Sequence, residues 1–172
     1  MQIAYTMAPG KGDTDLLLYR LAETLKARGL TTCGTVQINT GRAGGPCDMD
    51  VIVLPGGPTL RISQDLGLAS KGCRLDPAVL ETAVGLVSSR LNRDVDVLII
   101  NKFGKHEAEG RGFRTAIAEA IALGLPVLVG VNALNLEAFL EFVGPDAAFL
   151  DPSEKVLAQW CVGALEGQQE VV

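Results

Sequence analysis

A glycine-rich segment near the start of the chain has the residue types of a phosphate-binding loop. Residues 8–13 read Ala-Pro-Gly-Lys-Gly-Asp and come directly after a short apolar run. A working loop of this kind has the form G-x-x-x-x-G-K-[ST], in which backbone amides surround a phosphate, the lysine reaches its outer oxygens and the hydroxyl holds magnesium. Gly12 and Thr14 fit this form, but Asp13 stands at the lysine position and Asp15 adds a second carboxylate.

The carboxylate of Asp13 reverses the electrostatics of such a loop. Replacing an ammonium by a carboxylate at contact distance turns attraction into repulsion, and one such contact is worth about 4 kcal/mol at an effective dielectric constant of about 20. Lys11 is a candidate substitute. Three interpretations stay open: a turn that only caps a helix, a former phosphate loop with a changed ligand, and a triphosphate site. The candidate ligand-binding residues of the loop are Gly10, Lys11, Gly12, Asp13 and Thr14.

Basic side chains gather after residues 95–100, a stretch that is apolar except at Asp96. The following segment contains Lys102, Lys105, His106, Arg111 and Arg114. Such side chains grip phosphate-like groups, so this segment is a candidate oxyanion site. Glu107 and Glu109 oppose that assignment, and a solvated loop with internal ion pairs is the alternative. The ligand-binding residues predicted here are Asn101, Lys102, Lys105 and Arg111, and Arg61, Lys71 and Arg74 are candidates to converge on them.

Hydrophobic periodicity predicts the elements that hold these segments. Strands are expected at residues 2–8, 31–38, 49–54, 95–101 and 126–131, and helices at 14–28, 77–91, 113–122, 134–142 and 153–165. The strands at 2–8 and 95–101 are expected in the interior of the sheet because both are mostly apolar. Residues 31–38 and 49–54 are interpreted as an edge hairpin around a turn at 41–46, and residues 55–77 as a long irregular loop.

This order of elements predicts one α/β domain over residues 1–172, with three α/β/α layers and a mostly parallel sheet. Ligands bind such sheets beyond the carboxyl ends of the strands. The loops expected at that edge are 8–15, 55–76 and 101–112, so the glycine-rich loop and the basic segment should face one crevice. Asn132 and Asn135 follow the last core strand, where we expect them to cap a helix and where a nucleotide base is a candidate contact.

Composition narrows the classes of function. The net charge of -5 and the pI near 4.9 argue against general binding of nucleic acids or anionic membranes. No apolar run reaches about 18 residues and no signal peptide is visible, so we expect a cytoplasmic protein without membrane insertion. The cysteines form no C-x-x-C pair and there is one histidine, so no metal site is expected. Cys47 and Cys73 are expected in loops as simple buried or free thiols; the alternative is that they approach each other or bind a soft metal.

Longer segments resemble known families. Residues 97–107 resemble the nucleoside-triphosphatase family of small P-loop proteins, in which an apolar strand ends Asp-Glu-Ile-Gly-x-Met-Glu. In that family the aspartate helps to hold magnesium and the glutamate positions the attacking water. Asn101 and Lys102 take those places here, while Gly104 and Glu107 match. More specifically, residues 72–77, 102–105 and 107–114 are similar to the bacterial domain of unknown function 2478, whose genes often accompany molybdate transport genes.

Both departures from the triphosphatase pattern, Asp13 and Lys102, remove groups on which phosphoryl transfer depends. With the resemblance, they predict a P-loop-NTPase-like protein that binds a nucleotide, or an oxyanion such as phosphate or molybdate, without hydrolysing it. One alternative is an active nucleoside triphosphatase that uses Lys11 and Glu107 as substitutes. Another is a protein-interaction subunit, for a partner protein or for copies of itself, with no small ligand.

Overall fold

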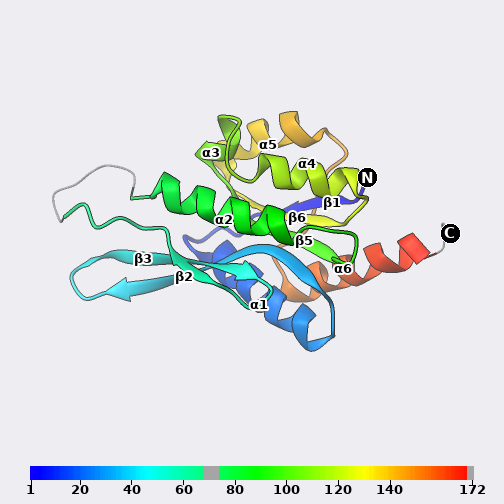
Figure 1. Ribbon diagram of the computed structural model, residues 1–172, viewed down its shortest axis with the longest axis horizontal. Coiled ribbons are helices and arrows are strands. Elements are labelled where there is room, and N and C mark those ends of the chain that lie inside the picture. Colours follow the sequence, from blue (N-terminus) through cyan, green and yellow to red (C-terminus); the bar gives the residue numbers. More distant parts are fainter. Residues whose placement is uncertain (68–73, 170–172) are drawn as a thin grey trace.

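The strands form one mixed β-sheet, and helices cover both of its faces (Figure 1). The computed structural model describes residues 1–67 and 74–169, so Lys71 and Cys73 lie outside the described residues. The strands are β1 (Ile3–Thr6), β2 (Thr32–Arg42), β3 (Gly45–Leu54), β4 (Thr59–Arg61), β5 (Val97–Phe103), β6 (Val127–Val131) and β7 (Ala148–Phe149). The helices are α1 (Asp13–Ala27), α2 (Pro77–Arg90), α3 (Lys105–Ala108), α4 (Arg114–Ala122), α5 (Leu136–Val143) and α6 (Glu154–Gln169), with a 3-10 turn η1 (Ala133–Asn135).

The strand order of the sheet is β4-β3-β2-β5-β6-β1-β7. β5 pairs in parallel with β2 and β6, and β1 pairs in parallel with β6 and β7. β3 pairs antiparallel with both β2 and β4. The mostly parallel sheet, predicted from the order of the elements, is therefore confirmed, as are the interior positions of β1 and β5.

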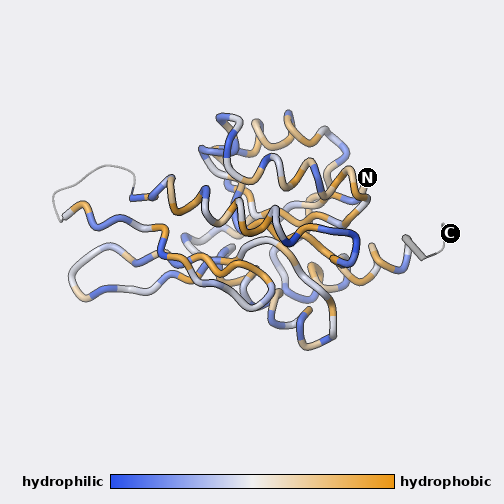
Figure 2. The backbone as a smooth tube through the Cα atoms, in the orientation of Figure 1, coloured by the Kyte–Doolittle hydropathy of each residue, from blue (hydrophilic) through white to orange (hydrophobic). Residues whose placement is uncertain are grey.

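Apolar side chains fill both interfaces between the sheet and the helices. Leu21 of α1 and Leu157 of α6 are fully buried on one face. Val87 of α2, Ile117 of α4 and Phe139 of α5 are fully buried on the other face. Figure 2 shows hydrophobic residues along the central strands and hydrophobic residues alternating with hydrophilic ones along the helices. The three α/β/α layers are thus confirmed. Within the described ranges, no helix is long and apolar enough to cross a membrane.

The hairpin of β2 and β3 is longer than the sequence predicted. β2 continues to Arg42 and β3 begins at Gly45, so the turn is shorter than the expected 41–46. Ion pairs hold the extension, with 2.7 Å from Arg42 Nη2 to Asp48 Oδ1. The outer half of the hairpin is exposed, so the apolar pattern that marks the inner half is missing there and could not reveal it.

Three short elements are missing from the sequence-based prediction. β4 lies at the start of the segment expected as an irregular loop, and it makes β4, not the hairpin, the edge of the sheet. α3 lies in the expected loop 101–112, and β7 forms the opposite edge. Each has four residues or fewer, too few for a periodic pattern. Cys47, expected in a loop, is an exposed residue of β3.

Candidate functional site

Two cavities lie at the carboxyl ends of the parallel strands. The first, which we call the loop cavity, has a volume of about 610 Å³ and lies between the glycine-rich loop and the ends of β5 and β6. The second, the apolar cavity, has a volume of about 310 Å³ and lies between β2, β3, β5, the start of α2 and residues 104–113. Asn101 and Lys102 line both. The glycine-rich loop and the start of the basic segment therefore face one crevice.

The predicted ligand-binding residues divide between the two cavities. Those that line the loop cavity are Gly10, Lys11, Gly12, Thr14, Asn101 and Lys102. Lys105 and Arg111 line the apolar cavity instead, so the structure does not bring them to the glycine-rich loop. Asp13 is not among the described residues that line either cavity.

Local backbone bonds shape the glycine-rich loop. Gly12 is the N-cap of α1 and has a φ of 81°, a left-handed conformation that glycine adopts without strain. Neither Asp13 nor Thr14 is therefore the N-cap, although both residue types are common at that position. Thr14 Oγ1 instead accepts a hydrogen bond from Ala8 N at 2.9 Å. Asp13 N donates to Gly10 O at 3.2 Å, which closes a tight turn before the helix.

The side chain of Asp13 folds back over this turn. Its carboxylate lies so close to Gly10 that a β-carbon at position 10 would collide with it. The carboxylate is thus packed on the loop backbone and outside the lining of the loop cavity. The repulsion that a carboxylate at the lysine position would exert on an anion is therefore smaller than at contact distance.

Asp15, the second carboxylate of the loop, is held by side-chain amides. Its Oδ2 accepts from Asn39 Nδ2 at 2.7 Å and from Gln37 Nε2 at 3.4 Å, and its Oδ1 accepts from Asn101 Nδ2 at 2.8 Å. These donors are neutral, so they satisfy the oxygens without neutralising the charge. Gln37 and Asn39 were not among the residues predicted for the site. The expected strand ended at residue 38, and only its continuation to Arg42 places both side chains on one face.

Asn101 stands where the resembling triphosphatase family has its magnesium-binding aspartate. It is 4% exposed, and its Oδ1 has no hydrogen-bond partner among the described residues. Its Nδ2 points at Asp15, so the amide donates to a carboxylate where a metal ligand would present oxygen. The other expected ligand, the hydroxyl of Thr14, already accepts from the loop backbone. With Asp13 at the lysine position, these residues do not fit a magnesium triphosphate held as in that family.

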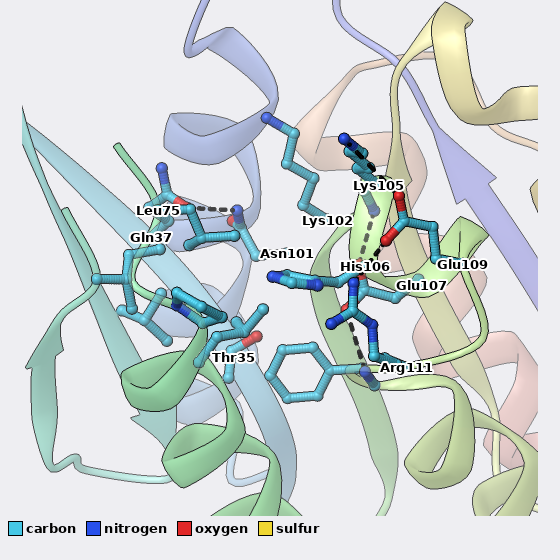
Figure 3. A pocket seen from close by; sticks show the side chains of 16 residues that line it. Thr35, Gln37, Leu75, Asn101, Lys102, Lys105, His106, Glu107, Glu109 and Arg111 are labelled. Atoms are coloured by element: carbon cyan, nitrogen blue, oxygen red, sulfur yellow. Dashed lines mark hydrogen bonds and ion pairs between the residues drawn. The ribbon is translucent and has the colours of Figure 1, made fainter. Parts of the chain in front are cut away.

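Lys102 carries an unshared positive charge at the boundary of both cavities. It is exposed, and no ion pair of its ammonium group occurs within residues 1–67 and 74–169. Lys105 Nζ and Arg111 Nη2 instead pair with Glu109, at 3.7 Å and 2.5 Å. The Arg111 guanidinium in particular holds the pKa of the Glu109 carboxyl below its usual range. Figure 3 shows Lys105, Glu109 and Arg111 grouped together and Lys102 extending apart from them.

Three other arginines that were candidates for this cluster are used elsewhere. The guanidinium carbon of Arg114 lies 4.2 Å from the ring centroid of Phe142. Arg61 forms ion pairs with two carboxylates of β3. Arg74 donates to a backbone carbonyl of β3 at 2.5 Å. These contacts stabilise the hairpin and the packing of α5, and they do not supply charge to the loop cavity.

Glu107 is a structural residue of the segment that follows β5. It is 3% exposed, and its Oε2 accepts from Gly104 N at 2.9 Å while its Oε1 accepts from Phe113 N at 3.1 Å. The carboxylate also lies against Gly112, where a β-carbon would collide with it. Both oxygens are therefore engaged by the backbone. These backbone contacts give the carboxylate a structural role in the turn between β5 and α4.

Comparison with known proteins agrees with this architecture. A family model described as "Protein of unknown function (DUF2478)" matches residues 3–160. The chain belongs to this family. This DUF2478 protein is also similar to the molybdenum import ATP-binding protein ModC 2 of Bradyrhizobium diazoefficiens, with 37% identity over 161 residues. That match covers 92% of this chain, which spans only 18% of the length of the relative.

A solved structure shares the fold over the whole chain. The solution structure of a human cancer-related nucleoside triphosphatase superposes with a TM-score of 0.56 and 19% identity, covering 99% of this chain and 98% of that one. At this identity the likeness establishes the fold alone. The P-loop-NTPase-like α/β fold and the DUF2478 resemblance, both predicted from the sequence, are thus confirmed.

Proposed function

We propose that this DUF2478 protein binds a small oxyanion, or the phosphate group of a nucleotide, in the loop cavity and does not hydrolyse it. The observation that carries the proposal is the unshared charge of Lys102, which lines that cavity together with the start of α1. The first turn of a helix offers backbone amides without intrahelical partners and the positive end of the helix dipole. Together they favour an anion even though Asp13 replaces the usual lysine. The Asp15 carboxylate also lines this cavity and opposes the anion, so we expect a modest affinity.

The loop cavity is large enough for more than a bare phosphate. Its volume of about 610 Å³ falls within the range of about 300–1,000 Å³ that small-molecule sites occupy. Asn132 lies on its wall, where its Oδ1 accepts from Asn135 N at 3.0 Å and caps η1. In the nucleotide form of the proposal, the ribose or base lies against this turn after β6.

The same residues support binding without turnover. Phosphoryl transfer depends on a cationic clamp, a metal ion and a group that orients the attacking water. Asp13 replaces the clamp, the Asn101 amide is directed at Asp15, and both oxygens of Glu107 accept backbone hydrogen bonds. An enzyme that recruits Lys11 and Glu107 is disfavoured for this reason, since one of its two substitutes is already engaged.

Molybdate is one candidate ligand within this class. The relative from Bradyrhizobium is called a molybdenum import ATP-binding protein, and this chain matches 18% of it. Molybdate, sulfate and phosphate are all small oxyanions that a lysine and helix amides bind through charge-assisted hydrogen bonds. We therefore propose a role in molybdenum metabolism together with the oxyanion site, and the ligand series below separates the two.

Titration calorimetry with phosphate, sulfate, molybdate and ATP tests the proposal, each with and without magnesium. At least one of these ligands should bind in the millimolar range or tighter. Lys102→Ala should weaken that binding by about 10-fold, the worth of one hydrogen bond to a charged group. Lys155→Ala removes another exposed lysine, on α6 and outside the lining of either cavity, and should leave the affinity unchanged.

Two results would contradict the proposal. If none of the four ligands binds at millimolar concentration, or if Lys102→Ala binds as tightly as the parent, the loop cavity is not an anion site and a protein-interaction role is favoured. If ATP is hydrolysed and Lys11→Ala abolishes the hydrolysis, the protein is an enzyme that uses a substitute lysine.

A further inference from the structure

The apolar cavity has a different character from the loop cavity. Its walls include Val51, Ile62, Leu80 and Phe113, each less than a tenth exposed. They come from β3, the segment after β4, α2 and the segment before α4. A volume of about 310 Å³ is at the lower end of the range for small-molecule sites, about 300 Å³, and accommodates one or two fused rings. Apolar walls of this kind favour a flat apolar surface on the ligand.

Two polar atoms on the lining side chains have no hydrogen-bond partner in the described part of the chain. They are Asn101 Oδ1 and His106 Nδ1, and both are shielded from solvent. Figure 3 shows the imidazole of His106 reaching from α3 toward Asn101. An unpaired polar atom in such a place is unfavourable, and native proteins contain few of them. A ligand that carries N–H groups on its ring edge supplies a donor to Asn101 Oδ1 and a partner to the imidazole.

Charge around this cavity is positive on balance. Lys102, Lys105 and Arg111 line it, and Glu107 and Glu109 are the carboxylates that oppose them. Glu107 is directed at backbone amides and Glu109 is shared by two of the cations. The charge of Lys102 is the one without a partner in the described residues. An anionic substituent on the ligand is therefore favoured at the side of the cavity that Lys102 lines.

We propose that the apolar cavity is a second binding site, for a planar heteroaromatic molecule that carries ring N–H groups and one anionic substituent. The ring lies between the apolar walls, its N–H groups face Asn101 and His106, and the anionic group faces Lys102. This site is separate from the proposed oxyanion site and does not depend on it. The two share Asn101 and Lys102 as a common wall, so each ligand affects the affinity for the other.

Three probes separate the contributions of ring, donors and charge. Orotate has a planar ring, ring N–H groups and a carboxylate; uracil has the ring and the N–H groups without the carboxylate; benzoate has a ring and a carboxylate without N–H groups. Each is titrated into the full chain and followed through backbone amide chemical shifts by NMR. Orotate should bind most tightly, in the millimolar range, and its shifts should centre on residues 104–113 and the start of α2.

Variants on either side of the shared wall locate the binding. His106→Phe keeps a ring and removes the unpaired nitrogen, and it should weaken orotate binding by about 3- to 10-fold, the worth of one neutral hydrogen bond. Ile62→Phe fills the cavity from the opposite wall and should also weaken orotate. Of the two cavities, Lys11 lines only the loop cavity. Lys11→Ala should therefore weaken phosphate binding and leave the affinity for orotate within about 2-fold of the parent.

The outcomes distinguish this proposal from the oxyanion proposal. Orotate shifts that are absent at millimolar concentration, or that fall on the glycine-rich loop, overturn the second site and leave the oxyanion site intact. Equal binding of orotate and benzoate overturns the role of the unpaired polar atoms. If both His106→Phe and Ile62→Phe are folded by their NMR spectra and bind orotate as the parent does, the ligand lies elsewhere. If the parent protein binds orotate but none of the oxyanions, only the oxyanion proposal is overturned.

Discussion

Replacing Glu107 by glutamine tests whether this carboxylate is structural. Glutamine keeps the shape and one acceptor oxygen, but it turns an NH2 group toward one of the two backbone amides, Gly104 N or Phe113 N, that now donate at 2.9 Å and 3.1 Å. One amide then loses its acceptor and faces another donor. Since the side chain is buried, water does not replace the lost partner.

The size of the effect follows from that single lost bond. A hydrogen bond to a charged group contributes about 1.5–3 kcal/mol, and the orphaned amide adds to the loss, so Glu107→Gln should destabilise the protein by about 2–3 kcal/mol. For a protein of this length, each kcal/mol lowers the melting temperature by about 2–4 °C, which gives a decrease of about 4–12 °C. Glu109→Gln makes the same chemical change at a side chain that is 42% exposed, and it should stay within about 0.5 kcal/mol.

Thermal unfolding followed by circular dichroism, with urea unfolding as a second measure, compares the two variants with the parent. A melting temperature of Glu107→Gln equal to that of Glu109→Gln would refute the structural assignment. The same holds if Glu107→Gln is as stable as the parent but abolishes a measurable ATP turnover, because the carboxylate would then act in catalysis.

Three further predictions concern Gly112, Cys161 and Asp48. Gly112→Ala should destabilise the protein more than Gly110→Ala, because both positions have positive φ but only a β-carbon at 112 meets a buried carboxylate; urea unfolding of the pair measures this. Burial raises the pKa of the Cys161 thiol to about 12. In the native protein at mildly alkaline pH, iodoacetamide should therefore modify the exposed thiol of Cys47 in β3 but not Cys161, and peptide mass mapping would show which thiol reacted. The Arg42 guanidinium holds the pKa of Asp48 below its usual range, so the stability that this carboxylate contributes is complete above its unfolded pKa of about 3.9 and is lost as the pH falls through the lower folded value. Asp48→Asn should therefore flatten the acid limb of the stability curve, and an unchanged limb would contradict the assignment.

Unbroken apolar runs are what made the fold predictable. Residues 97–100 are all fully buried in β5, and a run of this kind has few alternatives to a central strand. The outer half of the hairpin was not predictable, because its residues are mostly exposed and polar, and ion pairs such as that between Arg42 and Asp48 join its strands. Such pairs join residues of neighbouring strands, so no periodicity along one strand predicts them.

The site was predictable where chain topology decides it and not where local backbone geometry does. Strand order alone brings Lys102 to the glycine-rich loop, as predicted. Lys105 and Arg111 line the other cavity; Lys105 begins α3, which is too short to predict, and Arg111 lies in the turn after it. The backfolding of Asp13 depends on the turn at Gly10, which the residue types alone do not specify.

Phosphorus NMR of the protein with ATP, inorganic phosphate and magnesium in one sample tests binding without hydrolysis most directly. The account predicts that at least one set of phosphate resonances broadens, that the broadening is relieved in Lys102→Ala, and that the ratio of ATP to inorganic phosphate stays constant over time. Growth of the inorganic phosphate signal at the expense of ATP, above a protein-free control, would contradict the non-hydrolytic assignment. Resonances that stay as sharp as in that control would contradict the anion site itself.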